Sequence, residues 1–429
     1  MIKKTLIVLV ALTILVIGWW VFNSIPDRYD PERNFQDMQD ELLTQFIIAQ
    51  DSSVIELPAG HFLFSRSLAL EGVHHVTIRG KGIDQTVLSF KGQTDGAEGI
   101  RISNSSNITL EDFTVEDAVG DNIKVMDTDG ITFRRVKAAW TGPIKTENGS
   151  YGLYPVICKN VLIEDCEAMG SSDAGIYVGQ SEKVVIRNNK AYQNVAGIES
   201  ENSDDVLIYG NRAYDNTGGI LVFNLPGLTR YGKNIKVYDN TVTSNNRKNF
   251  GIKGAIVSNI PGGTGILVLA TNDVEIYGNT ISDHNTLGLG IISYNLVAAM
   301  EKDIGADPVN AYGGVRTVTD YRNDKNYDPY PGQIYLHDNA YSNTSWIPNI
   351  STDFGKLFLT KRGFGIPDVV YDGIKSPEYM KNGDINPYYK ICVDEKDIKF
   401  LAMDAGNDFK GLTEDITDYI CTDPLSSVY

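Results

Sequence analysis

The stretch from residue 183 to residue 223 decides the fold, and it reads KVVIRNNKAYQNVAGIESENSDDVLIYGNRAYDNTGGILVF. The segment VVIRNNKA, which follows Lys183, returns 22 residues later as VLIYGNRA after Asp205. A second motif, IESE after Gly197, returns 22 residues later as ILVF after Gly219. In each motif, apolar residues alternate with other residues. This two-residue period is typical of a strand with one face in a core. Two or three short strands in each unit of about 22 residues predict one coil of a solenoid.

The same unit extends along the chain in both directions. The first apolar positions of its copies lie 23, 22, 29, 39 and 60 residues apart, so the later spacings imply insertions. The second strand also has further copies. Most of them follow a glycine, which suits a tight corner with positive φ. The copies of the first strand begin at Val161, Val184, Val206, Ile235, Val274 and Ile334, and those of the second begin at Ile100, Ile123, Ile176, Ile198, Ile220, Ile266 and Ile291.

A polar position recurs five residues after the start of each first strand. Asparagine tolerates the left-handed conformation and bonds to the backbone in turns, and stacked amides can bond to each other from coil to coil. In the same register Cys166 takes the place of an asparagine, so we expect it to fill a buried ladder position as a small apolar thiol. The asparagines of this predicted ladder are Asn189, Asn211, Asn240, Asn279 and Asn339.

This pattern resembles the right-handed parallel β-helices of the pectate-lyase-like superfamily, over roughly residues 53–342. The resemblance implies an all-β chain that forms a single right-handed parallel β-helix. Residues 34–50 (NFQDMQDELLTQFIIAQ) read as an amphipathic helix that caps the first coil, within a capping region of residues 27–52. Residues 343–429 carry no repeat and are expected to form an irregular capping tail. Because this fold hosts lyases, hydrolases, epimerases and adhesins, it does not by itself name an activity.

A narrower resemblance is carried by the runs WTGPIKTENGSYGLYPVICKNVLIEDC, SSDAGIYVGQSEKVVIRNN and NTGGILVFNLPGL, and by the ending ICVDEKDIKFLAMDA. These runs look like a bacterial family of exported parallel β-helix repeat proteins, over nearly all of the chain after its N-terminal segment. Mannuronan epimerases are more distant relatives by fold. Their Asp-Pro-His-Asp motif is absent here, as is the Gly-His-Gly signature of polygalacturonases.

Residues 1–26 are expected to export or anchor the protein. Lys3 and Lys4 precede the uncharged run from Thr5 to Phe22, which approaches a bilayer span at ~1.5 Å per residue. No A-x-A-like cleavage site closes the run, so an uncleaved signal anchor and a cleaved signal peptide both stay open. Either one predicts a body outside the cytoplasm, anchored in the membrane or released as a periplasmic or secreted protein.

The composition narrows the class of partner. With 38 Lys and Arg against 55 Asp and Glu, the net charge is −17, which argues against nucleic acid as a partner. Hydrophobic residues make up 42% of the chain, enough for a sizeable core. Cys392 and Cys421 both lie in the last forty residues, and because export permits disulfides we expect a bridge between them.

One face of the second strand is expected to carry a row of outward side chains. Since Ile176 and Val178 point into the core, Tyr177 points out. Coils stack at ~4.8 Å, so equivalent residues on successive coils would form a strip about the length of a few sugar units. The residues of this strip are Arg101, Lys124, Tyr154, Tyr177, Glu199 and Leu221.

Such a strip has the groups that uronate chemistry requires. Abstraction of a proton beside a carboxylate needs a cation to neutralise that carboxylate, and a base and an acid near the carbon. We therefore predict catalytic roles for Lys124, Tyr154, Tyr177 and Glu199, with Arg101 as a second cation that binds substrate. A solvated surface row without activity is the alternative.

Two further groups of residues are candidates for substrate binding. Glu201 and Asp173 lie near Glu199, and a pair of carboxylates would instead support glycoside hydrolysis if it were suitably spaced. The loop from residue 140 to residue 154 offers aromatic faces beside polar groups, as sugar rings require, although a packed loop that covers the coil is an equal alternative. Its candidate residues are Trp140, Lys145, Glu147 and Tyr151.

Signals for metals and cofactors are weak. No two of the five histidines have zinc-finger or H-E-x-x-H spacing. Acidic turns such as Asp204-Asp205 leave calcium open, since it favours oxygen ligands. No other cofactor is predicted. Neither a Walker sequence, which binds phosphates, nor the G-x-S-x-G motif of a serine nucleophile is present.

Taken together, these features predict an exported, carbohydrate-associated protein of the cell envelope. The leading hypothesis is a polysaccharide lyase or epimerase that acts on uronate-containing glycans. The alternative is a non-catalytic protein that binds a glycan, or that serves as a scaffold for a protein partner in the envelope.

Overall fold

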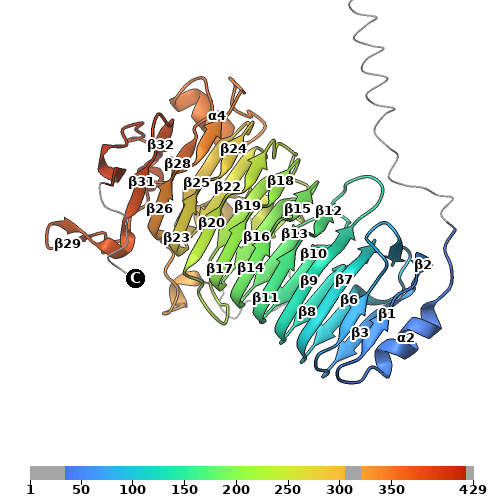
Figure 1. Cartoon of the computed structure of the whole chain (residues 1–429). Coiled ribbons are helices and arrows are strands. Elements are labelled where there is room, and N and C mark those ends of the chain that lie inside the picture. The colour runs from blue at the N-terminus through green and yellow to red at the C-terminus, as the bar shows by residue number, and fades with distance from the viewer. Residues whose placement is uncertain (1–33, 305–319, 422–429) are drawn as a thin grey trace, which may run out of the picture.

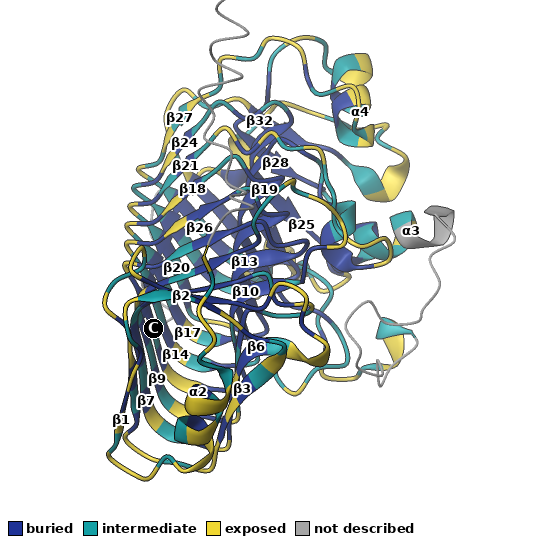
Figure 2. Ribbon diagram, turned by 90° about the vertical axis from the view of Figure 1, so that its right-hand side faces the viewer, coloured by how far each residue is buried: buried dark blue, intermediate teal, exposed yellow. Residues whose placement is uncertain are grey.

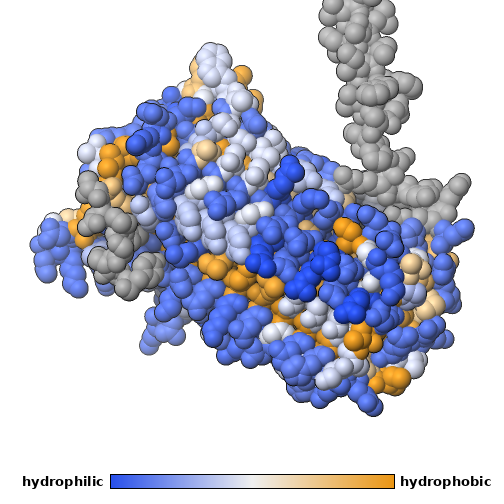
Figure 3. All heavy atoms as spheres, in the orientation of Figure 1, coloured by the Kyte–Doolittle hydropathy of each residue, from blue (hydrophilic) through white to orange (hydrophobic). Residues whose placement is uncertain are grey.

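The computed structural model describes residues 34–304 and 320–421. This part of the chain winds into a rod of stacked coils, with helix α2 (Gln39–Ile47) at its N-terminal end (Figure 1). The predicted export segment, residues 1–26, lies outside the described residues. Within the described ranges, no helix is long and apolar enough to cross a membrane. The side of the rod in view is mainly hydrophilic, with separate apolar patches (Figure 3).

Two long parallel sheets form the wall of the rod in the described residues. We call the 19-stranded one sheet A and the 11-stranded one sheet B. Sheet A consists of β1 (Val54–Glu56), β2 (Gly60–Leu63), β4 (Thr77–Arg79), β5 (Thr86–Ser89), β7 (Ser106–Glu116), β9 (Asp129–Ala139), β11 (Lys159–Glu164), β12 (Glu167–Met169), β14 (Glu182–Arg187), β15 (Lys190–Tyr192), β17 (Asp204–Tyr209), β18 (Arg212–Tyr214), β20 (Ile235–Tyr238), β21 (Thr241–Thr243), β23 (Asn272–Tyr277), β24 (Thr280–Ser282), β26 (Gly332–His337), β27 (Ala340–Ser342) and β31 (Ile391–Asp394). Sheet B consists of β3 (Arg66–Glu71), β6 (Asp95–Ser103), β8 (Ile123–Met126), β10 (Tyr151–Val156), β13 (Ala174–Gly179), β16 (Ala196–Glu201), β19 (Gly218–Phe223), β22 (Thr264–Leu269), β25 (Leu287–Ile292), β28 (Val369–Tyr371) and β32 (Phe400–Ala402).

The remaining elements lie outside these sheets. They are the helices α3 (Tyr294–Ile304) and α4 (Asp353–Lys361), the 3-10 turns η1 (Ile256–Asn259), η2 (Tyr321–Asn323), η3 (Pro387–Tyr389), η4 (Ala405–Asn407) and η5 (Thr417–Tyr419), and a hairpin of β29 (Met380–Lys381) and β30 (Asp384–Ile385).

The pairing register follows the sequence repeat. Val184 pairs with Val161 on one side and with Val206 on the other, and the row continues through Ile235 and Val274. These residues are buried inside the rod, because their side chains alternate with outward ones along each strand. The insertions inferred from the longer spacings leave this register unchanged.

The asparagine ladder is present in the core. The Nδ2 group of Asn189 donates to Oδ1 of Asn211 (3.0 Å), and Asn211 donates likewise to Asn240 (3.0 Å). Cys166 continues the ladder as predicted: its backbone N–H donates to Asn189 (2.8 Å), and its thiol is buried. The left-handed conformation expected of the ladder asparagines belongs instead to the residue before each of them, such as Asn188 (φ 58°).

The glycines predicted to precede the second strands lie inside them, as Gly197 does in β16, and they have a different role from the predicted one. Gly197 is not among the residues with positive φ, so no tight corner requires it. A Cβ atom at this position would lie 2.8 Å from Nδ2 of Asn216, which belongs to a second asparagine ladder with Asn194. The glycine is therefore required by close packing against the ladder rather than by backbone conformation.

Helix α2 closes the N-terminal end of the rod. It buries Leu42 and Phe46 against the first coil, and its contacts are mainly with β3. The helix is shorter than the predicted 34–50, because Gln36 lies in an isolated parallel bridge with Phe62 before the helix begins. The cap thus combines an amphipathic helix with an extended segment, both of which cover the first open edge.

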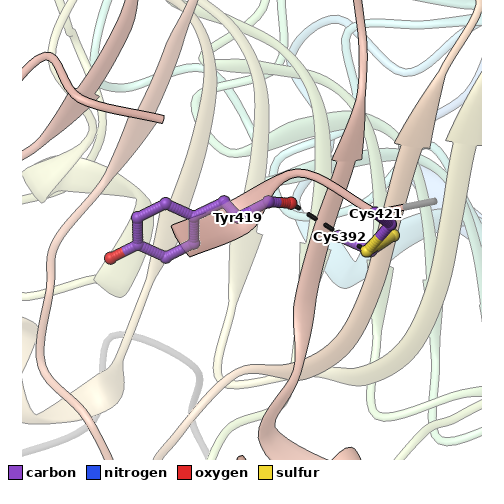
Figure 4. Close-up of a disulfide and its surroundings, with 3 residues drawn as sticks. All are labelled: Cys392, Tyr419 and Cys421. Carbon is purple, nitrogen blue, oxygen red and sulfur yellow. Dashed lines mark hydrogen bonds between the residues drawn. A yellow bond between two sulfur atoms is a disulfide. The ribbon is translucent and has the colours of Figure 1, made fainter. Parts of the chain in front are cut away.

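The C-terminal region continues the coils beyond the predicted boundary at residue 342. β28 and β32 extend sheet B, and β31 extends sheet A by pairing with β26. The predicted bridge is present, since Cys392 of β31 is joined to Cys421 by a disulfide (Figure 4). Cys158 and Cys166 are free and buried, and burial raises the pKa of each thiol to about 12.

Candidate active site

The predicted outward row exists in the register of sheet B. Arg101 pairs with Lys124, and Lys124 pairs with Tyr154 on the next coil. Farther along, Glu199 pairs with Tyr177 on one side and with Leu221 on the other. The periodic sequence therefore placed these residues on one face of one sheet.

The row is not the continuous surface strip that was predicted. Arg101 is exposed, and Lys124 and Tyr154 are half-buried. In contrast, Tyr177 is only 4% exposed, Glu199 1% and Leu221 0%. Figure 2 shows β10, β13 and β25 of sheet B in dark blue, the colour of buried residues. The second half of the row is thus a covered interface, and a substrate would meet only its first half.

Insertions that interrupt the repeat provide the cover. Tyr177 and Leu221 belong to an apolar cluster on the outer side of sheet B that includes Ile256 of η1 and Tyr294 of α3. A Cβ atom built on Gly218 would lie 3.3 Å from Cγ2 of Ile260, so the insertion lies directly on β19. Polar side chains also fasten the segment before η1, for example through Thr229, whose backbone N–H donates to Oε1 of Gln180 (3.0 Å).

The open half of the row ends in a compact group of charged residues. Nζ of Lys124 lies 3.9 Å from Oε1 of Glu98 and 4.0 Å from Oδ2 of Asp121, and 5.0 Å from the centre of the Tyr154 ring. The side chains of Glu98, Asp121 and Lys124 are 21%, 14% and 26% exposed, so solvent reaches all three. Within the described residues, the ammonium group of Lys124 makes these two long ion pairs and no hydrogen bond. We call Glu98, Asp121, Lys124 and Tyr154 the Lys124 cluster.

Within the Lys124 cluster, Asp121 is the group whose pKa is shifted to near neutral pH by burial. Burial raises its pKa to about 7, Lys124 works in the opposite direction, and Glu98 adds to the rise. Its Oδ1 atom accepts a hydrogen bond from the backbone N–H of Tyr151 (3.2 Å), which fixes the carboxyl group at the start of β10. A carboxyl group that titrates near neutral pH can both accept and return a proton under ordinary conditions.

Behind the cluster lies a covered group of tyrosines and carboxylates. The ring of Tyr154 is 4.5 Å from that of Tyr151 and 5.0 Å from that of Tyr177. The hydroxyl of Tyr177 donates to Oε1 of Glu201 (2.8 Å). Burial, and then the neighbouring charges of Asp173 and Glu201, raise the pKa of Glu199 well above its usual range. The buried Oε2 atom of Glu199 has no hydrogen-bond partner among the described residues. A protonated Glu199 follows from these surroundings.

The candidate residues of the loop from residue 140 to residue 154 also divide into buried and exposed ones. Trp140 is buried, and its indole N–H donates to the backbone oxygen of Ala118 (2.8 Å), so its ring is not a platform for a sugar. Tyr151 is buried beside Asp173, toward which its hydroxyl points at 3.4 Å. Lys145 and Glu147 are exposed. For Trp140, the alternative of a packed loop that covers the coil describes the structure.

Asp121 and Glu98 were not selected from the sequence. Asp121 precedes β8 by two residues and Asp173 precedes β13 by one, whereas Glu98 lies inside β6, two residues before Ile100. An acidic residue before each of several second strands is the signal that could have found them. Attention to the alternating positions from Ile100 and Ile123 onward missed these two residues, each of which lies two positions earlier.

No three His, Cys, Asp or Glu side chains of the described ranges come together as a metal site would require. At the acidic turn considered for calcium, Asp204 has an ion pair with Arg230 (3.3 Å), and Asp205 accepts a hydrogen bond from Asn234 (2.6 Å).

Residues 98–281 match the family described as "Right handed beta helix region". The fold is a right-handed parallel β-helix. The match covers the central coils and agrees with the parallel registers of both sheets, and it confirms the predicted fold and the predicted resemblance to parallel β-helix proteins. None of the curated proteins compared with this β-helix chain matches it.

Several solved structures are similar to this one. The A-module of the mannuronan C-5 epimerase AlgE4 from Azotobacter vinelandii is 17% identical, with a TM-score of 0.42 over 72% of this chain and 93% of that one. A DFA-IIIase from Arthrobacter chlorophenolicus A6 is 10% identical, with a TM-score of 0.47 over 80% and 90%. The N-terminal fragment of gene product 12 of bacteriophage Phi29 is 16% identical, with a TM-score of 0.42 over 74% and 57%. At such low scores these likenesses say nothing of the substrate of this chain.

Proposed function

We propose that the protein acts on a uronate-containing glycan by removing the proton beside the sugar carboxylate, as a polysaccharide lyase or epimerase does. The observation that carries this proposal is the half-buried ammonium group of Lys124, which has no hydrogen bond among the described residues and lies beside Asp121 and Tyr154. A cation in this state is suited to accept a substrate carboxylate, and Arg101 on the preceding coil adds a second positive charge.

The roles of the cluster follow from charge and protonation. Lys124 neutralises the substrate carboxylate, which makes the neighbouring C–H bond more acidic. The carboxylate form of Asp121 then takes the proton, since its pKa of about 7 suits a base near neutral pH. Burial raises the pKa of Tyr154, so its hydroxyl stays protonated and can protonate the leaving oxygen. For epimerisation, a proton returns to the opposite face of the same carbon.

Tyr177 and Glu199 have a supporting role in this proposal. Their covered position keeps them from direct contact with a substrate that arrives from solvent. The ring of Tyr177 packs against Tyr154 at 5.0 Å and so limits the motion of the proposed acid. We also infer that this chemistry takes place outside the cytoplasm, as the N-terminal sequence predicts.

The test uses the full chain in D2O with alginate, polygalacturonate and glucuronoxylan, and with laminarin as a neutral control. NMR would follow deuterium at the carbon beside the carboxylate, and absorbance would follow unsaturated products. We expect exchange with at least one uronate glycan and none with laminarin. Asp121→Asn and Lys124→Ala are expected to lower the rate about 100-fold or more.

Matched exposed residues serve as controls. Asp384→Asn and Lys233→Ala remove the same groups far from the cluster and are expected to leave the rate unchanged. Binding of a glycan without exchange would replace the proposal by the non-catalytic alternative. Absence of both binding and exchange would favour a scaffold protein.

The pH profile provides a second check. Because Asp121 must be ionised to act as a base, kcat/KM is expected to rise about tenfold per pH unit below a pKa of about 7 and to level off above it. A profile without an inflection between pH 6 and 8 would contradict the assignment of Asp121 as the base.

A further inference from the structure

A hollow lies on the outer side of sheet A, whereas the Lys124 cluster belongs to sheet B. It has a volume of about 360 Å³, at the lower end of the ~300–1,000 Å³ range of small-molecule sites. Its floor is formed by the ends of β7, β9, β12 and β15, and its walls by the turn at Ile83 and Asp84 and by Thr141. None of its lining residues belongs to the Lys124 cluster.

A small residue in a row of large ones creates this hollow. On the outward row at the strand ends, Glu116 pairs with Ala139 and Ala139 pairs with Met169. Met169 in turn pairs with Tyr192 on the next coil. Next in the row, Tyr192 stacks on Tyr214 at 5.2 Å, which fills the space between those coils. At Ala139 the side chain is a single methyl group, and the hollow lies at this position of the row, between Glu116 and Met169.

Both walls are fixed by hydrogen bonds within the protein. The backbone N–H and the hydroxyl of Thr141 donate to the two carboxylate oxygens of Asp117, each at 2.6 Å. On the other side, the hydroxyl of Thr114 donates to the backbone oxygen of Ile83 (2.5 Å). A hollow with fixed walls loses little conformational entropy when a ligand enters it.

The lining combines an apolar patch with charged groups that can bond to hydroxyls. Ala139, Met169 and Tyr192 form the apolar bottom of the hollow and are 3%, 5% and 8% exposed, so only small parts of them face it. Glu116 is 4% exposed and lines the hollow as an acceptor. Nζ of Lys137 lies 3.9 Å from Glu167, whose other oxygen is held by Lys190 at 2.8 Å, so Lys137 can donate to a ligand.

We propose that this hollow binds a neutral saccharide unit. A sugar ring has an apolar face and a rim of hydroxyl groups, which match the apolar floor and the Glu116 and Lys137 side chains. Asp84 and Glu116 outnumber Lys137 in the lining, so an anionic sugar would meet net repulsion. This inference goes beyond the proposed function, because it concerns a binding site for a different class of sugar and assigns no reaction to it.

The test measures binding to the full chain by saturation-transfer NMR, with cellotetraose, mannotetraose, xylotetraose and galactotetraose as probes. We expect saturable binding of at least one tetrasaccharide. Ala139→Leu places a larger side chain in the gap and is expected to weaken binding at least tenfold. Glu116→Gln keeps the shape and is expected to weaken binding as well, because a charged acceptor is lost.

Two controls separate this site from others. Ala340→Leu makes the same change at an exposed outward position of β27 and is expected to leave the affinity unchanged. Asp121→Asn is expected to abolish exchange at the Lys124 cluster while tetrasaccharide binding persists, so the two proposals can fail separately. Failure of all four sugars to bind, or equal binding by Ala139→Leu and the parent chain, would overturn the inference.

Discussion

The outer faces of the two sheets have the same periodic origin but different surroundings. On sheet A, outward charged side chains of β9, β11 and β14 pair with their equivalents on neighbouring coils. Glu164, for example, accepts hydrogen bonds from Arg134 (2.6 Å) and Arg187 (2.9 Å). On sheet B, the equivalent side chains from Tyr177 onward lie under the insertions, and Glu199 has carboxylates as charged neighbours. One repeat thus produces a self-paired surface on one side and a covered, acidic interface on the other.

The difference appears in the pKa values of the two glutamates. Burial would raise the pKa of Glu164, but the hydrogen bonds from Arg134 and Arg187 outweigh it and hold that pKa below its usual value. Burial and like charges raise the pKa of Glu199 instead. The comparison teaches that an outward position in the repeat does not define a surface residue. What lies above the position decides whether it forms part of a surface or a site.

The largest expected effect concerns two leucines that both point outward. Leu221 on sheet B is fully buried under the cover, whereas Leu207 on sheet A is half-buried. We expect Leu221→Ala to lower the free energy of unfolding by about 2–5 kcal/mol, because it leaves a cavity. Leu207→Ala is expected to cost less than about 1 kcal/mol. Urea denaturation of the two variants measures both values, and equal losses would contradict the covered state of sheet B.

A pH-dependent effect is expected for Glu199→Gln. Since the pKa of Glu199 is raised in the folded state, folding favours its protonated form, and its contribution to stability is lost as pH rises from the unfolded value of ~4.3 toward the folded one. Relative to the parent chain, Glu199→Gln should therefore gain stability at pH 8 compared with pH 5, by up to about 1.4 kcal/mol per pH unit over this window. Urea denaturation at the two pH values measures the gain. A difference between variant and parent that is independent of pH would show that Glu199 is ionised when folded.

Glu164→Gln on sheet A is expected to act in the opposite direction. The lowered pKa of Glu164 means that its stabilising contribution is present above pH ~4.3 and is lost as pH falls through its folded value. At pH 7 the variant should lose about 1 kcal/mol, with a smaller loss in 1 M NaCl because salt screens the pairs. An unchanged loss in high salt would mean that packing, and not charge, is the source of the effect.

An effect of similar size that does not depend on salt is expected where aromatic rings take the place of the charges in the same row. Tyr238 stacks between Tyr209 (4.8 Å) and Tyr277 (4.9 Å), so these rings cover one another's faces. Tyr238→Ala should cost about 0.5–1.5 kcal/mol beyond the loss of buried area. Tyr388→Ala, at a 42% exposed position where the ring meets Tyr389 edge-on and is not stacked between two rings, is the control in the same urea denaturation. A cost equal to that of the control would show that the stack contributes nothing.

Much of the rod could be predicted because its information is local and periodic. The alternation in segments such as that of Val184 fixes which side chains point inward, and a one-residue slip would reverse every one of them. The ladder position of Cys166 followed from counting five residues from Val161. The bridge between Cys392 and Cys421 followed from their shared place near the end of the chain.

The candidate site could be predicted only in part. The row of Arg101, Lys124 and Tyr154 followed from the repeat. The repeat did not show that the row becomes covered from Tyr177 onward. Asp121 lies at a corner, where side-chain direction follows from the path of the chain and not from a period of two. Its raised pKa depends on burial by neighbouring coils, which no local pattern expresses.

The sequence by itself determined the coils, the pairing register, the inward faces and the polar ladders, because each follows from a repeat that every coil satisfies alone. Only the tertiary structure decided that Tyr177 and Glu199 are covered, that Lys124 lies between Glu98 and Asp121, and that a gap remains above Ala139. The physical reason is that burial and charge environment depend on what packs against a position. Here the packing elements are insertions such as the one that carries η1, which have no period and meet sheet B only after the chain has folded.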